Sequence, residues 1–205
     1  EQSKDNLFSF LSNDNSFLLP VPMMNIINGG SHADNDVDIQ EFMIAPIGAK
    51  SFSESLRYGC EVFNALKSLL KSKGKNTNVG DEGGFAPNIN SSNQVIEIII
   101  QAIEDAGLKT GRDIMISLDV ASTEFYSDNI YNLIGEAKKL SSDDMINYLK
   151  ELVGSYPIYS IEDGMAEDDW EGWTNLTNEL GKNIQLVGDD LFVTNLNRLK
   201  LGIEK

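Results

Sequence analysis

Short apolar runs that each end in an acidic residue recur along the second half of the chain. The runs and the residues that close them are 114–118 with Asp119, 158–161 with Glu162, and 184–188 with Asp189. A helix-like stretch precedes each run, which predicts buried parallel strands. In an α/β barrel the carboxyl ends of such strands meet at one rim, where the chemistry takes place. The pattern therefore predicts three carboxylates that converge on one point.

The first half of the chain has a different order, with two strands followed by two helices. Residues 18–27 are apolar and contain two prolines, which favours a strand over a helix. Residues 38–47 alternate loosely and predict a second strand. Apolar residues then repeat at helical spacing over 53–73 and 92–106.

From residue 113 onward strands alternate with helices. The helices are predicted at 142–153, 168–180 and 194–205. The first follows a Ser141-x-x-Asp144 capping box, and Trp170 and Trp173 of the second are expected to pack in the core. The whole order, β-β-α-α and then repeated βα units, predicts an α/β fold with a parallel sheet, as in part of a TIM-type barrel.

About five strands are predicted, whereas a closed barrel of this kind needs eight. An open parallel sheet with a bare edge is an unusual end for a domain. We therefore expect the chain to be a fragment. Residues 1–17, polar and rich in Ser and Asn, would be a lead-in or the tail of a helix, and residues 18–205 an incomplete barrel domain.

Composition narrows the possible partners. The chain has 205 residues and a net charge of −16, without a basic patch, which argues against nucleic-acid binding. No apolar run approaches the roughly 20 residues of a membrane span, and residues 1–20 lack the features of a signal peptide. The single cysteine, Cys60, excludes an internal disulfide framework and fits a reducing cytosol. The acidity also has a simpler interpretation, a solvated surface.

The three strand-end carboxylates indicate a metal site. Converging carboxylates repel one another unless a hard cation lies between them, and Mg²⁺ suits an all-oxygen site. Each acid taken singly could instead cap a helix or face solvent, because Asp favours the N-cap position. Three acids at the same topological position favour the metal.

Other candidate residues lie in loops and on the second strand. Glu82 has glycines on both sides, which is typical of a flexible turn but also of a carboxyl held near a reacting oxygen as a proton donor. His32, the only histidine, follows a Gly-rich turn. Gln40 and Glu41 are adjacent on the second strand and would face opposite sides; periodicity alone predicts that Glu41 is exposed.

Together these motifs resemble those of the enolases (phosphopyruvate hydratases), from about residue 18 to the end. The matching segments are Leu-Pro-Val-Pro-Met-Met-Asn at 19–25, Asn-Gly-Gly-Ser-His-Ala at 28–33, Gln-Glu-Phe-Met-Ile-Ala-Pro at 40–46, the loop 80–87, Ser-Leu-Asp119, Ser-Ile-Glu162-Asp163, and Gly-Asp-Asp-Leu-Phe-Val-Thr-Asn at 188–195. Asn-Gly-Gly-Ser-His-Ala-Asp-Asn together with Glu-Asp-Gly at 162–164 is similar to the bacterial branch.

The resemblance implies a glycolytic lyase that reversibly dehydrates 2-phospho-D-glycerate to phosphoenolpyruvate with Mg²⁺. The implied roles are metal ligands for Asp119, Glu162 and Asp189, proton donor for Glu82, an assisting acid for Glu41, and substrate contacts for His32, Gln40, Glu41, Glu162 and Asp189. It also implies a cytoplasmic homo-oligomer at full length, which in bacteria can reach the cell surface or be secreted.

The resemblance also has gaps. Enolases carry a smaller N-terminal domain that supplies a mobile loop and a second-Mg²⁺ ligand, and their lysine base and phosphate-binding segment lie on later strands. No lysine in this chain occupies a strand end in a matching context, so no base is assigned. We expect the chain alone to be inactive and the full-length protein to be active.

Two other functions stay open. A different acid dehydratase of the same superfamily would share the three carboxylates, but such relatives usually lack the Gly-Asp-Glu-Gly-Gly loop. A binding role, as a surface adhesin or as a scaffold in an RNA-degrading assembly, would not need Mg²⁺.

Overall fold

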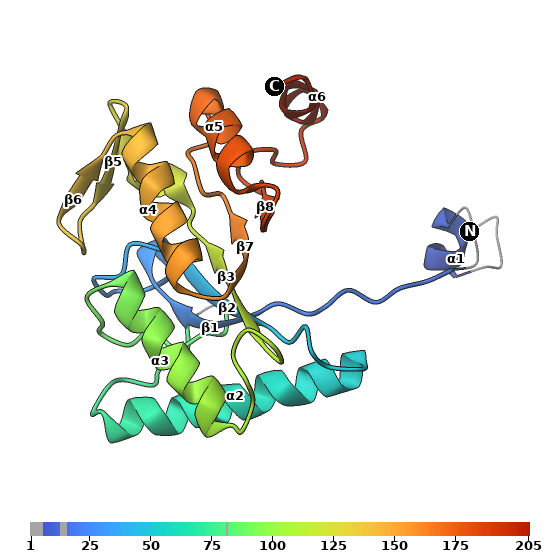
Figure 1. Ribbon diagram of the computed structural model, residues 1–205, viewed down its shortest axis with the longest axis vertical. Coiled ribbons are helices and arrows are strands. Elements are labelled where there is room, and N and C mark those ends of the chain that lie inside the picture. Colours follow the sequence, from blue (N-terminus) through green and yellow to red (C-terminus); the bar gives the residue numbers. More distant parts are fainter. Residues whose placement is uncertain (1–5, 13–15, 81) are drawn as a thin grey trace.

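The computed structural model describes residues 6–12, 16–80 and 82–205. Its centre is a five-stranded sheet with α-helices along one side, which confirms the predicted α/β fold as part of a TIM-type barrel (Figure 1). The strands of this sheet, in spatial order, are β1 (Met24–Asn28), β2 (Glu41–Ala45), β3 (Met115–Asp119), β7 (Ile158–Glu162) and β8 (Gln185–Val187). Strand β2 is antiparallel to both of its neighbours, whereas β3, β7 and β8 are parallel.

Five α-helices lie beside the sheet, arranged from the end with β1 to the end with β8 (Figure 1). They are α2 (Phe52–Ser72), α3 (Ser92–Asp105), α4 (Ser142–Ser155), α5 (Trp170–Leu180) and α6 (Leu196–Glu204). All five were predicted from the sequence to within a few residues. The single cysteine, Cys60, is an exposed free thiol on α2.

The two faces of the sheet differ in polarity. Alternation along β2 and β3 directs Phe42, Ile44, Ile116 and Leu118 to one face, where they are fully buried. There they join a single core cluster with the inner faces of the helices. The opposite face carries Ser117, which pairs in register with Ser160 of β7. In register, Met43 of β2 lies beside Ser117, so this face combines apolar and polar side chains.

Side-chain caps mark where helices α2 to α6 begin. The capping box that the sequence predicts at α4 is present, with the Ser141 side chain accepting from the Asp144 N–H and the Asp144 side chain accepting from the Ser141 N–H. Helix α5 begins at Trp170 instead of 168 because Asp169 is its N-cap. Helix α6 begins at Leu196 instead of 194 because Asn195 is its N-cap. Trp173 is buried and Trp170 packs against the core, as expected.

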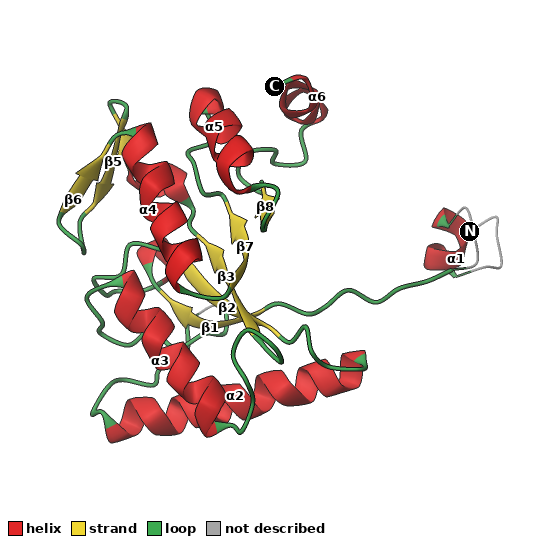
Figure 2. Cartoon of the chain, in the orientation of Figure 1, coloured by secondary structure: helices red, strands yellow, loops and turns green. Residues whose placement is uncertain are grey.

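A small three-stranded sheet was not predicted. It consists of β4 (Tyr126–Ser127), β5 (Ile130–Leu133) and β6 (Lys138–Leu140), and Figure 2 shows it apart from the main sheet. Asp128 and Asn129 both have positive φ at its first turn, the backbone of a tight hairpin. The Asp-Asn pair was the available signal, but its flanking strands are too short to show a clear alternation.

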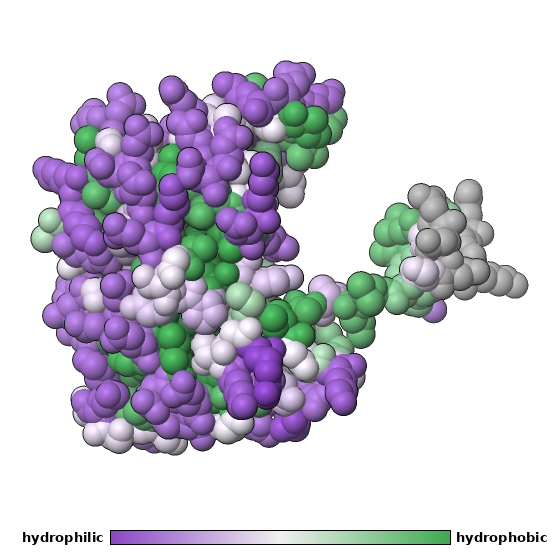
Figure 3. All heavy atoms as spheres, in the orientation of Figure 1, coloured by the Kyte–Doolittle hydropathy of each residue, from purple (hydrophilic) through white to green (hydrophobic). Residues whose placement is uncertain are grey.

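The N-terminal region differs from the prediction of a strand over 18–27, because β1 begins only at Met24. Residues 16–23 run extended from the sheet towards a short helix, α1 (Leu7–Leu11) (Figure 1). Their apolar side chains are exposed, Leu18 by 96% (Figure 3). The predicted lead-in at 1–17 lies partly outside the described residues. Among the helices that the structure describes, none is long and apolar enough to cross a membrane.

Candidate metal centre

The strand ends form one row across the sheet. In register, Asn28 of β1 lies opposite Glu41, Glu41 opposite Asp119, Asp119 opposite Glu162, and Glu162 opposite Val187. Neighbours in register direct their side chains to the same face of a sheet. Because β2 runs in the opposite direction, the row combines the start of that strand with the carboxyl ends of β1, β3, β7 and β8. The sequence prediction that strand-end acids converge is therefore confirmed for Asp119 and Glu162.

Two acids of this row and the neighbouring Asp163 lie close enough to share an ion. One carboxylate oxygen from each of Asp119, Glu162 and Asp163 lies within 4.8 Å of the other two. Burial, reinforced by the charges of Glu162 and Glu41, raises the pKa of Asp119 to about 7. Burial and the charges of Asp163 and Asp189 raise the pKa of Glu162 to about 7. Burial first and the neighbouring charges second therefore both disfavour the charged forms of these two acids.

The donor set fits a hard divalent cation. All three groups offer carboxylate oxygen, the preferred ligand of Mg²⁺. At Mg–O distances of about 2.1 Å, two ligand oxygens on opposite sides of one ion are about 4.2 Å apart. The three oxygens lie within 4.8 Å of one another, which places them around a space of the size that one such ion needs.

Two further groups hold the Asp119 carboxylate in place. Its Oδ1 accepts the Ala121 N–H at 3.1 Å, where Ala121 takes a left-handed φ of 46°. Its Oδ2 lies 3.4 Å from Nε2 of Gln40, a long donor contact. Gln40 lies just before β2 and not in it, so the expected alternation with Glu41 does not apply. Both residues approach the same carboxylate.

Glu41 is largely buried, and the expectation that it is exposed was wrong. Its side chain is 15% exposed, and its Oε1 lies 3.2 Å from Nδ1 of His32. Burial raises the pKa of Glu41, and the charge of Glu82 raises it further, while His32 lowers it. Sequence alternation could not reveal this burial because it comes from the neighbouring strand and the His32 loop. The structure thus brings Glu41 and His32 together at the rim.

The Glu82 loop is a tight glycine turn, as predicted. The Gly80 N–H donates to the Gly84 carbonyl at 2.9 Å, and the Gly83 N–H donates to the Gly80 carbonyl at 3.1 Å. Gly83 has a φ of 97°, which a residue with a side chain rarely adopts. Glu82 itself is exposed, and its charge acts on Glu41. The preceding residue, Asp81, lies outside the described residues.

The third predicted ligand, Asp189, is not in the acidic group, and Asp163 stands there instead. Asp189 is exposed and lies two residues beyond β8, although its charge does act on Glu162. Asp163 is only 3% exposed and had no role in the sequence prediction. The available signal was the acidic doublet Glu162-Asp163 at the end of a buried strand.

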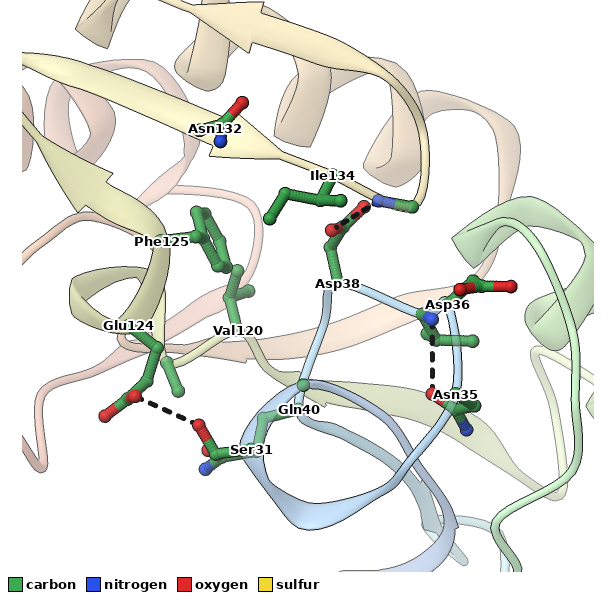
Figure 4. A pocket seen from close by; sticks show the side chains of 14 residues that line it. Ser31, Asn35, Asp36, Asp38, Gln40, Val120, Glu124, Phe125, Asn132 and Ile134 are labelled. Atoms are coloured by element: carbon green, nitrogen blue, oxygen red, sulfur yellow. Dashed lines mark hydrogen bonds between the residues drawn. The ribbon is translucent and has the colours of Figure 1, made fainter.

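A pocket of about 260 Å³ opens beside the rim, between the loop after η1 (Gly30–His32) and the small sheet (Figure 4). The Ser31 hydroxyl donates to Glu124 at 3.0 Å across it. Asp38 accepts the backbone N–H groups of Gly135 and Glu136 at 2.9 and 3.1 Å. Gln40 lines this pocket, whereas the three carboxylates of the acidic group do not. Gln40 therefore connects the pocket with the candidate metal centre.

The comparison with known families agrees with this geometry. Residues 16–205 match the model described as "Enolase, C-terminal TIM barrel domain". The match includes every strand of the sheet and every residue of the row. The chain therefore belongs to the family of enolase C-terminal TIM barrel domains.

Proposed function

We propose that this chain is the metal-binding part of a lyase that dehydrates 2-phospho-D-glycerate to phosphoenolpyruvate with Mg²⁺. The observation that carries the proposal is the in-register row in which Glu41, Asp119 and Glu162 lie side by side at one rim. Family membership supports a lyase of the enolase superfamily. The Gly-Asp-Glu-Gly-Gly loop favours this substrate over those of other acid dehydratases, and the motif at 28–35 favours the bacterial branch.

Each residue has a proposed role that depends on its position in the site. Asp119, Glu162 and Asp189 would hold Mg²⁺, which when bound offsets the negative charge that develops on a substrate carboxylate as the neighbouring proton leaves. Glu82, exposed in its glycine turn, would donate a proton to the departing 3-hydroxyl. Glu41 would assist beside it, and His32 and Gln40 would orient the substrate.

The proton-abstracting base is proposed to come from outside this set. The row at the rim consists of Asn28, Glu41, Asp119, Glu162 and Val187, none of which is a lysine. We propose that residues 18–205 work with further barrel strands and a second domain in a cytoplasmic, oligomeric enzyme. The chain alone is then expected to bind metal without turning over substrate.

Isothermal titration with Mg²⁺ and 2-phosphoglycerate tests the proposal. We expect 2-phosphoglycerate to bind to the chain in Mg²⁺ and not in EDTA. Binding that is equal in both conditions would favour the binding role over the enzyme. Phosphoenolpyruvate formation, followed by ultraviolet absorbance, should be undetectable with the chain alone, and measurable turnover would contradict the proposed external base.

A further inference from the structure

Asp163 is a buried carboxylate whose oxygens contact the loop after β8. Its Oδ2 accepts the N–H groups of Asp189 and Asp190 at 3.3 and 2.9 Å, and its Oδ1 accepts that of Leu191 at 3.3 Å. Three successive N–H groups of one loop therefore converge on one side chain. Such hydrogen bonds compensate the carboxylate for its loss of water.

The backbone of Asp163 is hydrogen-bonded to β8 and to the segment that follows β3. Its N–H donates to the Val187 carbonyl at 3.0 Å, and its carbonyl accepts the Ser122 N–H at 3.1 Å. Its φ of 44° is left-handed, a conformation that Asp and Asn tolerate better than most residues. This bend directs the Asp163 side chain towards the β8 loop while Glu162 remains in the row.

Asp189 depends on that loop for its position. The Phe192 and Val193 N–H groups donate to the Asp189 carbonyl at 3.1 and 2.7 Å, which makes a tight turn. Among the described residues, no hydrogen bond or ion pair is recorded for the exposed Asp189 carboxylate. The backbone from which this side chain projects is held by Asp163, through the Asp189 N–H.

We propose that Asp163 is a positioning residue that holds the Asp189–Leu191 turn so that the Asp189 carboxylate faces Glu162. The inference rests on the proposed metal site, in which Asp189 is a ligand. Asp163 lies close enough to Asp119 and Glu162 to compete for the ligand role. Its engagement by three N–H groups assigns it to the support of the ligands instead, as outer-shell carboxylates do in metal sites.

Two substitutions distinguish the effect of the Asp163 carboxylate from the effect of its left-handed backbone conformation. Asp163→Gly removes the side chain and tolerates the positive φ. Asp163→Asn keeps one acceptor oxygen and the left-handed preference. Asp169→Asn is the matched control, because Asp169 also accepts a backbone N–H, that of Gly172, and two hydroxyl groups away from this loop.

Amide hydrogen exchange in EDTA is the first measurement, since it needs no metal. We expect the amides of 189–191 to exchange about tenfold faster or more in Asp163→Gly, with Asp163→Asn in between, because they lose their acceptor. The amides of β3 report whether each variant is folded. Asp169→Asn should leave the 189–191 amides unchanged. Unchanged exchange in folded Asp163→Gly would overturn the proposal.

Mn²⁺ titration of the same proteins is the second measurement. We expect the affinity to fall about 10- to 100-fold in Asp163→Gly, less in Asp163→Asn, and not in Asp169→Asn. Complete loss of binding with unchanged loop exchange would make Asp163 a direct ligand and refute the positioning role. Unchanged affinity despite faster exchange would also refute it. If the unaltered chain binds no Mn²⁺, the proposed metal site itself fails, an outcome that the exchange data distinguish from failure of the positioning role of Asp163.

Discussion

Two aspartates at opposite ends of β3 show how position decides the effect of a charge. Asp113, just before the strand, has its pKa lowered by Arg112 and by the Lys109 N–H. Asp119, at the end of the strand, has its pKa raised to about 7 by burial and neighbouring acids. The first carboxylate therefore stabilises the folded chain at neutral pH, and the second opposes folding.

Substitutions at these two sites should have opposite effects on stability. At pH 8 in EDTA, Asp119→Asn is expected to raise the urea midpoint because it removes a buried charge. Asp113→Asn is expected to lower it. Asp119→Asn should also weaken Mn²⁺ binding by more than the roughly 10- to 100-fold typical of outer-shell changes, whereas Asp113→Asn should not. A lower midpoint for Asp119→Asn would contradict the charge argument.

The site residues were predictable from sequence to different degrees. Asp119 and Glu162 each close a recognisable strand, so their convergence followed from the parallel sheet. The burial of Glu41 depends on which strands are neighbours, which local periodicity does not contain. Asp163 acts through a left-handed backbone and a distant loop, and neither leaves a sequence signal beyond an acidic doublet.

At the scale of elements, side-chain caps mark where helices α2 to α6 begin. The capping box at Ser141 was predictable from the sequence because its two residues, Ser141 and Asp144, lie within four positions of each other. The small sheet was not readable, because it is stabilised by distant groups such as Asp38 and Asp169. Elements with local determinants were predicted, and the element with long-range determinants was missed.

Removing the cap of α4 should weaken the fold measurably. Ser141→Ala is expected to cost about 1 kcal/mol of unfolding free energy, within a range of roughly 0.5 to 2 kcal/mol, because an N–H at the helix start loses its acceptor. Ser68→Ala, at an exposed position near the C-terminal end of α2, is the control and should be neutral or slightly stabilising. Urea denaturation compares the two, and equal effects would argue against the cap.

A pair of glycine substitutions tests the contact between the small sheet and the main body. A Cβ at Gly135 would overlap the Asp36 carbonyl, whereas a Cβ at Gly154 on α4 meets nothing within 4 Å. We expect Gly135→Ala to destabilise the chain, and Gly154→Ala to stabilise it by up to about 1 kcal/mol. Thermal unfolding measures both. Equal unfolding midpoints for the two variants would mean that the small sheet can shift away from Asp36 without a loss of stability.

At the scale of the whole molecule, the element order was the most predictable property. The sequence pattern indicated β-β-α-α followed by βα units, and the main elements of the chain follow that order. In the sheet, the pairing is antiparallel for the first three strands and parallel from β3 onward. The exposed course of residues 16–23 was not predicted, because an apolar stretch normally indicates burial. Apolar side chains normally pack against one another, whereas those of residues 17–19 remain exposed.

The stability of the whole chain should depend on pH through the rim. The pKa values of Asp119 and Glu162 are raised from 3.8 and 4.5 to about 7. In their protonated forms these two acids stabilise the folded chain. This contribution to the free energy of unfolding is fully present below pH 4 and is lost as the pH rises through about 7. Acids with lowered pKa values, such as Asp144, act in the opposite direction, but only below about pH 4.

Urea midpoints in EDTA should consequently fall between pH 5 and pH 8. Mg²⁺ binds the deprotonated acids and stabilises the folded chain in proportion to ln(1 + [Mg²⁺]/Kd), so it should reduce or reverse the fall. All midpoints are compared in Ca²⁺-free buffers of the same ionic strength, so that only the pH and the Mg²⁺ concentration differ. A midpoint that rises with pH in EDTA would contradict the repulsion at the rim.

The lone thiol on α2 has a practical consequence for locating the ion. Because Cys60 is the only cysteine and is exposed on a regular helix, a nitroxide reagent would yield one spin-labelled species without further engineering. Paramagnetic Mn²⁺ at the rim would then form a spin pair with that label. Pulsed dipolar spectroscopy would then measure the distance from α2 to the cation in solution, in the unaltered sequence and without crystals.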